Sequence, residues 1–143
     1  MILLDTNVLS EPWRPQPNPA VLRWLDAQDE NALYICTPVL AELRFGAARL
    51  PSSTRKQRLD NHINLLETTG FRGRVLDFDA AAALAFGTVG AHKEKIGRRM
   101  EPLDAMIAAI AFARGLKLAT RDEFDFSDLG IELINPFKAA PVR

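Results

Sequence analysis

The first eleven residues, MILLDTNVLSE, contain the pattern that decides the fold. Three apolar residues at 2–4 stop at Asp5, which is typical of a short buried strand followed by a polar turn. The same kind of apolar segment recurs four times along the chain, at residues 33–36, 74–78, 116–119 and 131–134. The sequence therefore predicts a sheet of four to five short strands.

Helices are predicted between these strands by residues that cap or begin a helix. Such residues stand at Asn18-Pro19, Thr37-Pro38, Ser53 or Thr54, Asp79 and Pro102. Because strands and helices alternate, we expect a mostly parallel sheet covered by helices on both faces, a three-layer α/β/α sandwich.

Length and composition indicate one globular domain. The chain has 143 residues, of which 48% are hydrophobic and 25% charged, which excludes a disordered or collagen-like protein. One cysteine, Cys36, excludes an internal disulfide framework and fits a reducing cytoplasm. The first residues lack the basic segment of a signal peptide, and no apolar run approaches the ~18 residues of a membrane span. We therefore expect a cytoplasmic protein that does not associate with a membrane.

The charges of the chain balance overall, with 18 basic and 18 acidic residues, but they are segregated along it. Residues 1–42 carry a balance of −4, residues 43–100 one of +6, and residues 101–143 one of −2. A neutral total argues against a nucleic-acid partner, because phosphate binders are usually basic. The bases at 44–58 and 93–99 are nevertheless dense enough to form a phosphate-binding surface, unless they are ordinary solvated helix faces.

Four acidic residues stand where strands end or helices begin. Asp5 and Asp122 follow apolar strands, while Glu42 and Asp104 lie in the first turns of predicted helices. Ligands of open α/β sheets bind at the carboxyl ends of the strands, and a helix N-terminus stabilises an anionic side chain. If the four acids converge, a divalent cation would relieve their repulsion, and oxygen ligands favour Mg²⁺ or Mn²⁺ over Zn²⁺. Such a site suits phosphodiester hydrolysis.

Each acid also has a purely structural interpretation. Asp5 is equally expected in an Asx turn, Asp104 as an ordinary first-turn acid, and Glu42 as a solvated helix residue. Asp122 belongs to an acidic loop that also contains Asp125. The residues themselves leave these alternatives open.

Four segments, in matching order, resemble the VapC-type PIN-domain ribonuclease toxins and, among these, the FitB subgroup. They are MILLDTNVLSE, TPVLAEL at 37–43, PLDAMIAAIA at 102–111 and LATRD at 118–122. The resemblance implies a single PIN domain over residues 1–137, followed by a C-terminal tail at 138–143. It also implies an RNA substrate, a small DNA-binding antitoxin of the VapB/FitA kind, operator DNA contacted only through that antitoxin, and a homodimer.

Transferred position by position, the resemblance implies a set of catalytic acids and a set of supporting residues. The catalytic acids are Asp5, Glu42, Asp104 and Asp122. Those expected to bind Mg²⁺ or Mn²⁺ are Asp5, Asp104 and Asp122. The residues expected to support the acids or to orient phosphate are Thr6, Asn7, Thr120, Arg121 and Asp125. The position of Asp122 varies in the family, so either Asp122 or Asp125 is expected to close the site.

Three hypotheses of function remain. The leading one is a Mg²⁺- or Mn²⁺-dependent ribonuclease that serves as the toxin of a toxin–antitoxin pair. The second is a small-substrate phosphohydrolase with Asp5 as nucleophile, although the triplet Asp-Thr-Asn lacks the second acid of a DxD pattern. The third is a catalytically silent PIN-like module that sequesters a partner. A groove for a helical antitoxin segment could include Phe45, Leu59 and Ile63, which are equally explained as core residues.

Overall fold

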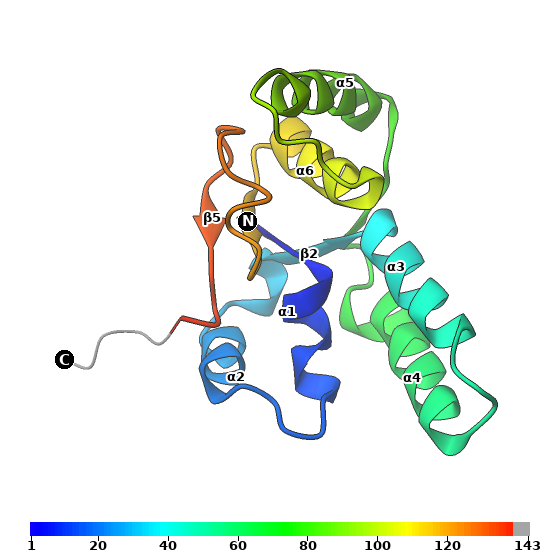
Figure 1. The fold of residues 1–143 in the computed structure, drawn as a ribbon. Helices are drawn as coiled ribbons and strands as arrows, with labels where there is room; N and C mark the ends of the chain where they lie inside the picture. Colours follow the sequence, from blue (N-terminus) through cyan, green and yellow to red (C-terminus); the bar gives the residue numbers. More distant parts are fainter. Residues whose placement is uncertain (139–143) are drawn as a thin grey trace.

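The computed structural model describes residues 1–138 and contains a five-stranded sheet surrounded by helices (Figure 1). The strands are β1 (Ile2–Leu4), β2 (Leu33–Cys36), β3 (Val75–Leu76), β4 (Lys117–Ala119) and β5 (Leu133–Ile134). The α-helices are α1 (Thr6–Ser10), α2 (Pro19–Asp26), α3 (Thr37–Ala48), α4 (Thr54–Leu65), α5 (Ala80–Lys95) and α6 (Pro102–Arg114). Short helical turns at Glu11–Trp13, Glu30–Ala32 and Leu66–Gly70 complete the elements. The predicted C-terminal tail lies outside the described residues, apart from Lys138.

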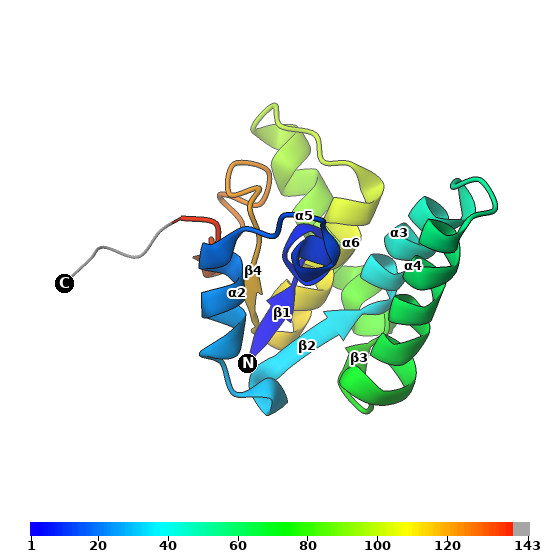
Figure 2. The ribbon, with the colours of Figure 1, turned by 90° about the horizontal axis from the view of Figure 1, so that it is seen from below.

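The sheet has the strand order β3-β2-β1-β4-β5, and every neighbouring pair runs parallel. β1 is central, because Ile2 pairs with Leu33 of β2 on one side and with Lys117 of β4 on the other. Figure 2 shows β4, β1 and β2 next to one another, with α1 beginning where β1 ends. From β1, the chain adds β2 and β3 on one side of the sheet and β4 and β5 on the other. In open α/β sheets, ligands bind at the carboxyl ends of the strands where the order reverses in this way, which here are the ends of β1, β2 and β4.

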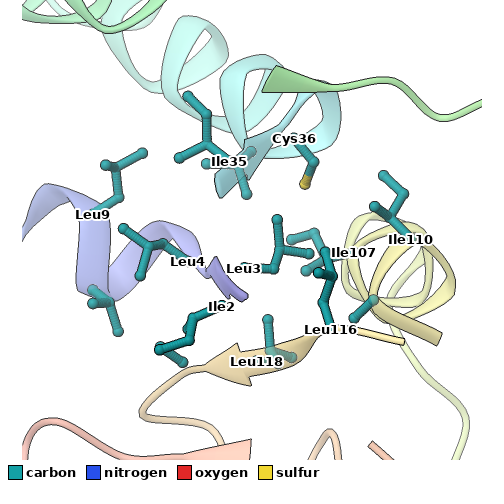
Figure 3. Close-up of a cluster of buried hydrophobic side chains, with 14 of the residues drawn as sticks. Ile2, Leu3, Leu4, Leu9, Ile35, Cys36, Ile107, Ile110, Leu116 and Leu118 are labelled. Atoms are coloured by element: carbon teal, nitrogen blue, oxygen red, sulfur yellow. The ribbon is translucent and has the colours of Figure 1, made fainter. Parts of the chain in front are cut away.

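The core lies on both faces of this sheet. Leu3 and Leu118 pair in register and point toward Ile107 of α6, whereas Leu4 points to the other face, toward Leu9 of α1 (Figure 3). All five side chains are buried. Because alternate residues of a strand point to opposite faces, the unbroken apolar run at 2–4 requires helices on both faces. The predicted α/β class and the layered architecture are confirmed.

Most predicted helix starts have the expected cap. Asn18, Ser53 and Asp79 each accept a backbone N–H from the first turn of the following helix. Thr37 was expected to cap α3, and this prediction is wrong. Its hydroxyl instead accepts the N–H of Phe78 at 3.2 Å, and α3 begins without a side-chain cap. The strand predicted at 74–78 is shortened to β3, whose pairing with β2 ends at Leu76 opposite Cys36, the last residue of β2.

The helix surfaces differ from the sequence expectation at two points. Ile63 is buried as a core residue should be, but Phe45 is 63% exposed, so its interpretation as a core residue is wrong. Lys93, expected on a phosphate-binding surface or on a solvated helix face, is only 1% exposed. In the described part of the chain, no helix combines the length and the apolar character needed to cross a membrane.

Candidate active site

The carboxyl ends of β1 and β4 bring two predicted site segments together. Asp5 is the first residue after β1, and Thr120 is the first residue after β4. The parallel pairing of Leu4 with Ala119 continues into a hydrogen bond, in which Asp5 N–H donates to the Ala119 carbonyl oxygen at 2.9 Å. Asp5 therefore lies beside a loop that is 115 residues away in sequence.

Both carboxylate oxygens of Asp5 accept hydrogen bonds. Oδ1 accepts the backbone N–H of Thr6 at 2.8 Å. Oδ2 accepts the hydroxyl of Thr120 at 2.7 Å and the side-chain amide of Asn7 at 3.2 Å. Since Asp5 is only 4% exposed, these donors fix the direction of its carboxylate and offset part of the cost of burying its charge.

Asn7 connects Asp5 to Asp122. Its amide nitrogen donates to Oδ2 of Asp5 and to Oδ2 of Asp122, the latter at 3.1 Å. Its amide oxygen accepts the backbone N–H of Arg121 at 3.2 Å. The Thr120 hydroxyl also accepts the N–H of Asp122 at 3.0 Å, so the turn after β4 is held against the first turn of α1.

Glu42 and Asp104 reach the same place from helices. Glu42 lies in the second turn of α3, directly after β2, and Asp104 lies in the first turn of α6. The pKa of Asp5 is raised to about 6, because burial and the charges of Glu42 and Asp122 raise it by more than the hydrogen bonds from Thr120 and Thr6 lower it. The pKa of Asp104 is raised to about 7, first by burial and then by the charges of Asp5, Glu42, Asp125 and Asp122. These mutual effects show that the predicted acids converge.

The remaining predicted residues differ in how they reach the acids. Thr6, Asn7 and Thr120 contact the carboxylate of Asp5 directly. Arg121 contributes its backbone N–H to Asn7, while its guanidinium lies over the ring of Phe137 at 4.8 Å. Asp125 is exposed and raises the pKa of Asp104.

The chemistry of the site fits a hard divalent cation. The acids offer carboxylate oxygens, and their mutual repulsion is the condition that a bound cation relieves. The hydroxyl oxygen of Thr6, next to Asp5, is enclosed and lacks a hydrogen-bond partner within the described residues. Among residues 1–138, however, no three acidic, histidine or cysteine side chains stand in an arrangement that could already hold a metal ion. Side chains would have to turn inward on binding.

Two charged residues, Glu11 and Lys93, are buried, which the sequence did not predict. Glu11 is 5% exposed and accepts the N–H of Asn18 at 3.0 Å, which closes the proline-rich loop after α1. Lys93 is buried in α5, close enough to Asp125 for that charge to raise its pKa. A signal for Lys93 exists, since it continues the helical spacing of the buried residues Ala82, Ala85 and Val89.

The family model of the PIN domain matches residues 2–131. The chain belongs to the PIN-domain family. This match covers β1, all six α-helices and the acids described above. The acids after β1 and β4 and at the starts of α3 and α6 are therefore part of a PIN domain.

Relatives of this PIN domain extend over its whole length. It is 44% identical to the plasmid stability protein StbB of Pseudomonas syringae, over 97% of this chain and 100% of the relative. It is 40% identical to the VapC ribonuclease Y4jK of Sinorhizobium fredii, over 98% of this chain and 100% of the relative. A solved structure of FitAB bound to an IR36 DNA fragment superposes with a TM-score of 0.91 at 34% identity, with 100% of both chains covered. The resemblance to VapC/FitB-type toxins and the predicted nuclease class are confirmed.

Proposed function

We propose that this chain is a Mg²⁺- or Mn²⁺-dependent ribonuclease and the toxin of a toxin–antitoxin pair. The observation that carries the proposal is the mutual effect of the acids, whose charges help to raise the pKa of Asp5 to about 6 and of Asp104 to about 7. Carboxylates that destabilise one another in a folded protein need a cation or a proton, and a cluster of this kind marks a functional site. RNA as the substrate is carried by the similarity to VapC ribonucleases.

The roles of the acids follow from how each is held. Asp5, Asp104 and Asp122 would bind the cation, Asp5 with an orientation fixed by its hydrogen bonds. Glu42, in the second turn of α3, would accept a proton from the attacking water or orient it. A bound Mg²⁺ or Mn²⁺ supplies a lowered pKa for that water and neutralises charge on the phosphoryl oxygens. Asn7 keeps Asp5 and Asp122 at a fixed separation through its shared amide.

The basic residues would hold RNA phosphates, but only some of them are free for this role. Arg44 pairs with Glu67, Lys56 pairs with Asp60, and both contacts are within 3.1 Å. Within residues 1–138, Arg55, Arg58 and Arg99 have no acidic partner within ion-pair distance. The RNA surface would therefore depend on fewer basic residues than the charge balance of +6 at residues 43–100 suggests.

The partners belong to the same proposal. A small antitoxin would bind this chain and connect it to operator DNA, as expected from the similarity to FitAB bound to DNA. An RNA substrate and a DNA-binding partner would place the pair in the cytoplasm. The homodimer expected from the resemblance would need an apolar contact surface, and Leu84 of α5 is an exposed apolar side chain, at 78%. Light scattering of the purified chain tests the dimer.

The two alternative functions have less support. Asp5 is buried and accepts hydrogen bonds on both oxygens, which leaves it poorly exposed as a nucleophile for a small phosphate ester. A silent binding module would have no use for acids that raise one another's pKa. A calorimetric titration with Mn²⁺ distinguishes this module, which would not bind the cation, from the nuclease.

The experiment that tests the proposal is cleavage of RNA by the purified chain with Mg²⁺, Mn²⁺ or a chelator. We expect cleavage with either cation and none with the chelator. Cleavage that continues at the same rate in the chelator would contradict the metal-dependent mechanism. A phosphate-ester substrate hydrolysed faster than RNA would instead favour the phosphohydrolase.

A further inference from the structure

Lys93 occupies an unusual place for a lysine. It lies in the last turns of α5, and the whole residue is only 1% exposed. Lysine is almost never fully buried without a partner, because removing its charge from water is costly. Its burial therefore calls for a physical reason.

The ammonium group of Lys93 has no fixed partner in the protein. Throughout residues 1–138, no hydrogen bond or ion pair to its Nζ is found. Burial lowers the pKa of Lys93, the charge of Arg98 lowers it further, and the charges of Asp128 and Asp125 raise it. Asp128 is already paired with Arg98 at 2.8 Å, so it is not free to bind Lys93.

The ammonium group is nevertheless not sealed inside the core. The hydroxyl of Thr6 is the one enclosed side-chain nitrogen or oxygen without a partner in the described residues. An unpartnered Nζ that does not share this condition must keep access to the outside. Lys93 lines a pocket of about 460 Å³, so this pocket is where its ammonium group can reach solvent while the stem stays buried.

The walls of this pocket combine basic residues, acids and an aromatic ring. The basic residues are Lys93, Arg98 and Arg99, the acids are Glu101, Asp104 and Asp125, and the ring is that of Phe124. Asp104 is shared with the acid cluster, so the pocket opens directly beside the proposed metal site. Arg99 is exposed and free of ion pairs within the described residues.

Phe124 forms a second feature of the pocket. Its side chain is 67% exposed, and the guanidinium of Arg98 lies over its ring, 4.5 Å from the centroid. Exposed aromatic rings next to cations are the surfaces on which single-stranded RNA stacks its bases. An anion on the Lys93 side and a base on the Phe124 side would be parts of the same nucleotide.

We propose that this pocket is a nucleotide subsite of the RNA substrate, in which Lys93 and Arg99 bind the phosphate next to the scissile bond and Phe124 stacks against the base. This assignment rests on the proposed ribonuclease function. It gives the ammonium group of Lys93, which has no hydrogen bond or ion pair within residues 1–138, an anionic partner in the substrate phosphate. It also puts basic residues in the walls of a pocket that Asp104 lines, where they reduce the repulsion between the acids and the RNA backbone.

The test compares Lys93→Met with Lys117→Met in RNA binding measured without divalent cations. Methionine keeps the length of the buried stem and removes the charge, while Lys117 is exposed at the opposite end of β4. For Lys93→Met we expect roughly ten-fold weaker RNA binding. We also expect the slope of log affinity against log salt concentration to be smaller by about 0.7, the value for one phosphate contact on a single strand. Lys117→Met should keep the wild-type slope. An unchanged slope for Lys93→Met overturns the proposal.

One further measurement distinguishes a Lys93 that binds phosphate from a Lys93 that organises the acids. Mn²⁺ titration should give equal or tighter binding for Lys93→Met, because a cation is removed from the acid cluster. Weaker Mn²⁺ binding would mean that Lys93 organises the acids, and this would overturn the phosphate role. If wild type neither binds nor cleaves RNA, the proposed function itself fails. If Lys93→Met does not fold, the salt dependence of RNA binding is measured for Arg99→Gln instead, because Arg99 is exposed. A wild-type slope for Arg99→Gln would then overturn the nucleotide subsite.

Discussion

Asp5 and Asp104 have the same side chain and serve the same site, but the structure holds them in different ways. Asp5 is set at the end of β1, is 4% exposed and accepts hydrogen bonds from Thr6, Asn7 and Thr120. Asp104 projects from the first turn of α6, and no hydrogen bond to its carboxylate is found within residues 1–138. Burial raises the pKa of both, yet the pKa of Asp104 reaches about 7 and that of Asp5 about 6.

The difference shows two ways of preparing an acid for a cation. At the strand end, donors stabilise the charged form of Asp5 and fix its orientation before anything binds. At the helix start, neighbouring carboxylates oppose the charge of Asp104, so this acid keeps a proton or binds a cation near neutral pH. One half of the site is preorganised, and the other half responds to what binds.

The largest expected effect is on RNA cleavage by Asp5→Asn and Asp104→Asn. Each substitution removes a charged ligand from a centre that contributes several kcal/mol to transition-state stabilisation, so we expect a loss of about a thousand-fold. Single-turnover cleavage measures it. Asp26→Asn, an exposed acid at the end of α2, is the matched control and should cleave as wild type does. Equal cleavage rates for Asp104→Asn and wild type would show that Asp104, the acid at the start of α6, is not part of the active site.

The next effect is a dependence of stability on pH in the protein without divalent cations. The pKa of Asp5 is about 6 in the folded protein and 3.8 as its ordinary value, so the folded state binds more protons between these pH values. The free energy of unfolding should therefore fall as pH rises from about 4 to about 7, by about 3 kcal/mol from Asp5 alone. Asp104 acts in the same direction, up to a pKa of about 7.

Urea unfolding at a series of pH values measures this dependence. Addition of Mn²⁺ at pH 7.5, roughly the end of the titration range, should restore stability, because a cation replaces the lost protons. The Asp5→Asn/Asp104→Asn double variant should lose most of the pH dependence. A wild-type profile that is flat over this range would mean that the acids do not oppose one another.

A smaller effect is expected for Thr120→Val, which tests the preorganised half alone. Valine keeps the shape of the buried side chain but removes the hydroxyl that donates to Asp5 and accepts from Asp122 N–H. We expect Mn²⁺ affinity and cleavage to fall roughly ten- to a hundred-fold, with a higher pKa for Asp5. Calorimetry and cleavage rates measure the two effects. Unchanged Mn²⁺ affinity would show that hydrogen bonding at the strand end is dispensable.

The smallest expected effect distinguishes Asp122 from Asp125. The charge of Asp122 raises the pKa of both Asp5 and Asp104, and Asp122 accepts a hydrogen bond from the side-chain amide of Asn7. Asp125 raises the pKa of Asp104 but not that of Asp5. We expect Asp122→Asn to lower cleavage about ten-fold and Asp125→Asn by less than about three-fold. A larger loss for Asp125→Asn would assign to Asp125 the role that closes the site.

Much of the fold was predictable from local sequence. Apolar runs that end at polar residues located all five strands, and capping side chains located α2, α4 and α5, because these signals act within one turn or one strand. The predicted cap of α3 was wrong, because a group distant in sequence forms a hydrogen bond with the capping side chain. Thr37 lost its capping role because the N–H of Phe78, 41 residues away, lies next to its hydroxyl.

For the site, the sequence by itself determined which residue types stand after each strand and at each helix start. Their family pattern named Asp5, Glu42, Asp104 and Asp122. Only the tertiary structure decided how they act on one another, since parallel pairing of β1 with β4 brings Asp5 to Thr120 across 115 residues. It also decided that Lys93 is buried at a pocket beside Asp104 rather than solvated with the other bases. Burial and charge coupling depend on distances in space, which the order of residues along a chain does not contain.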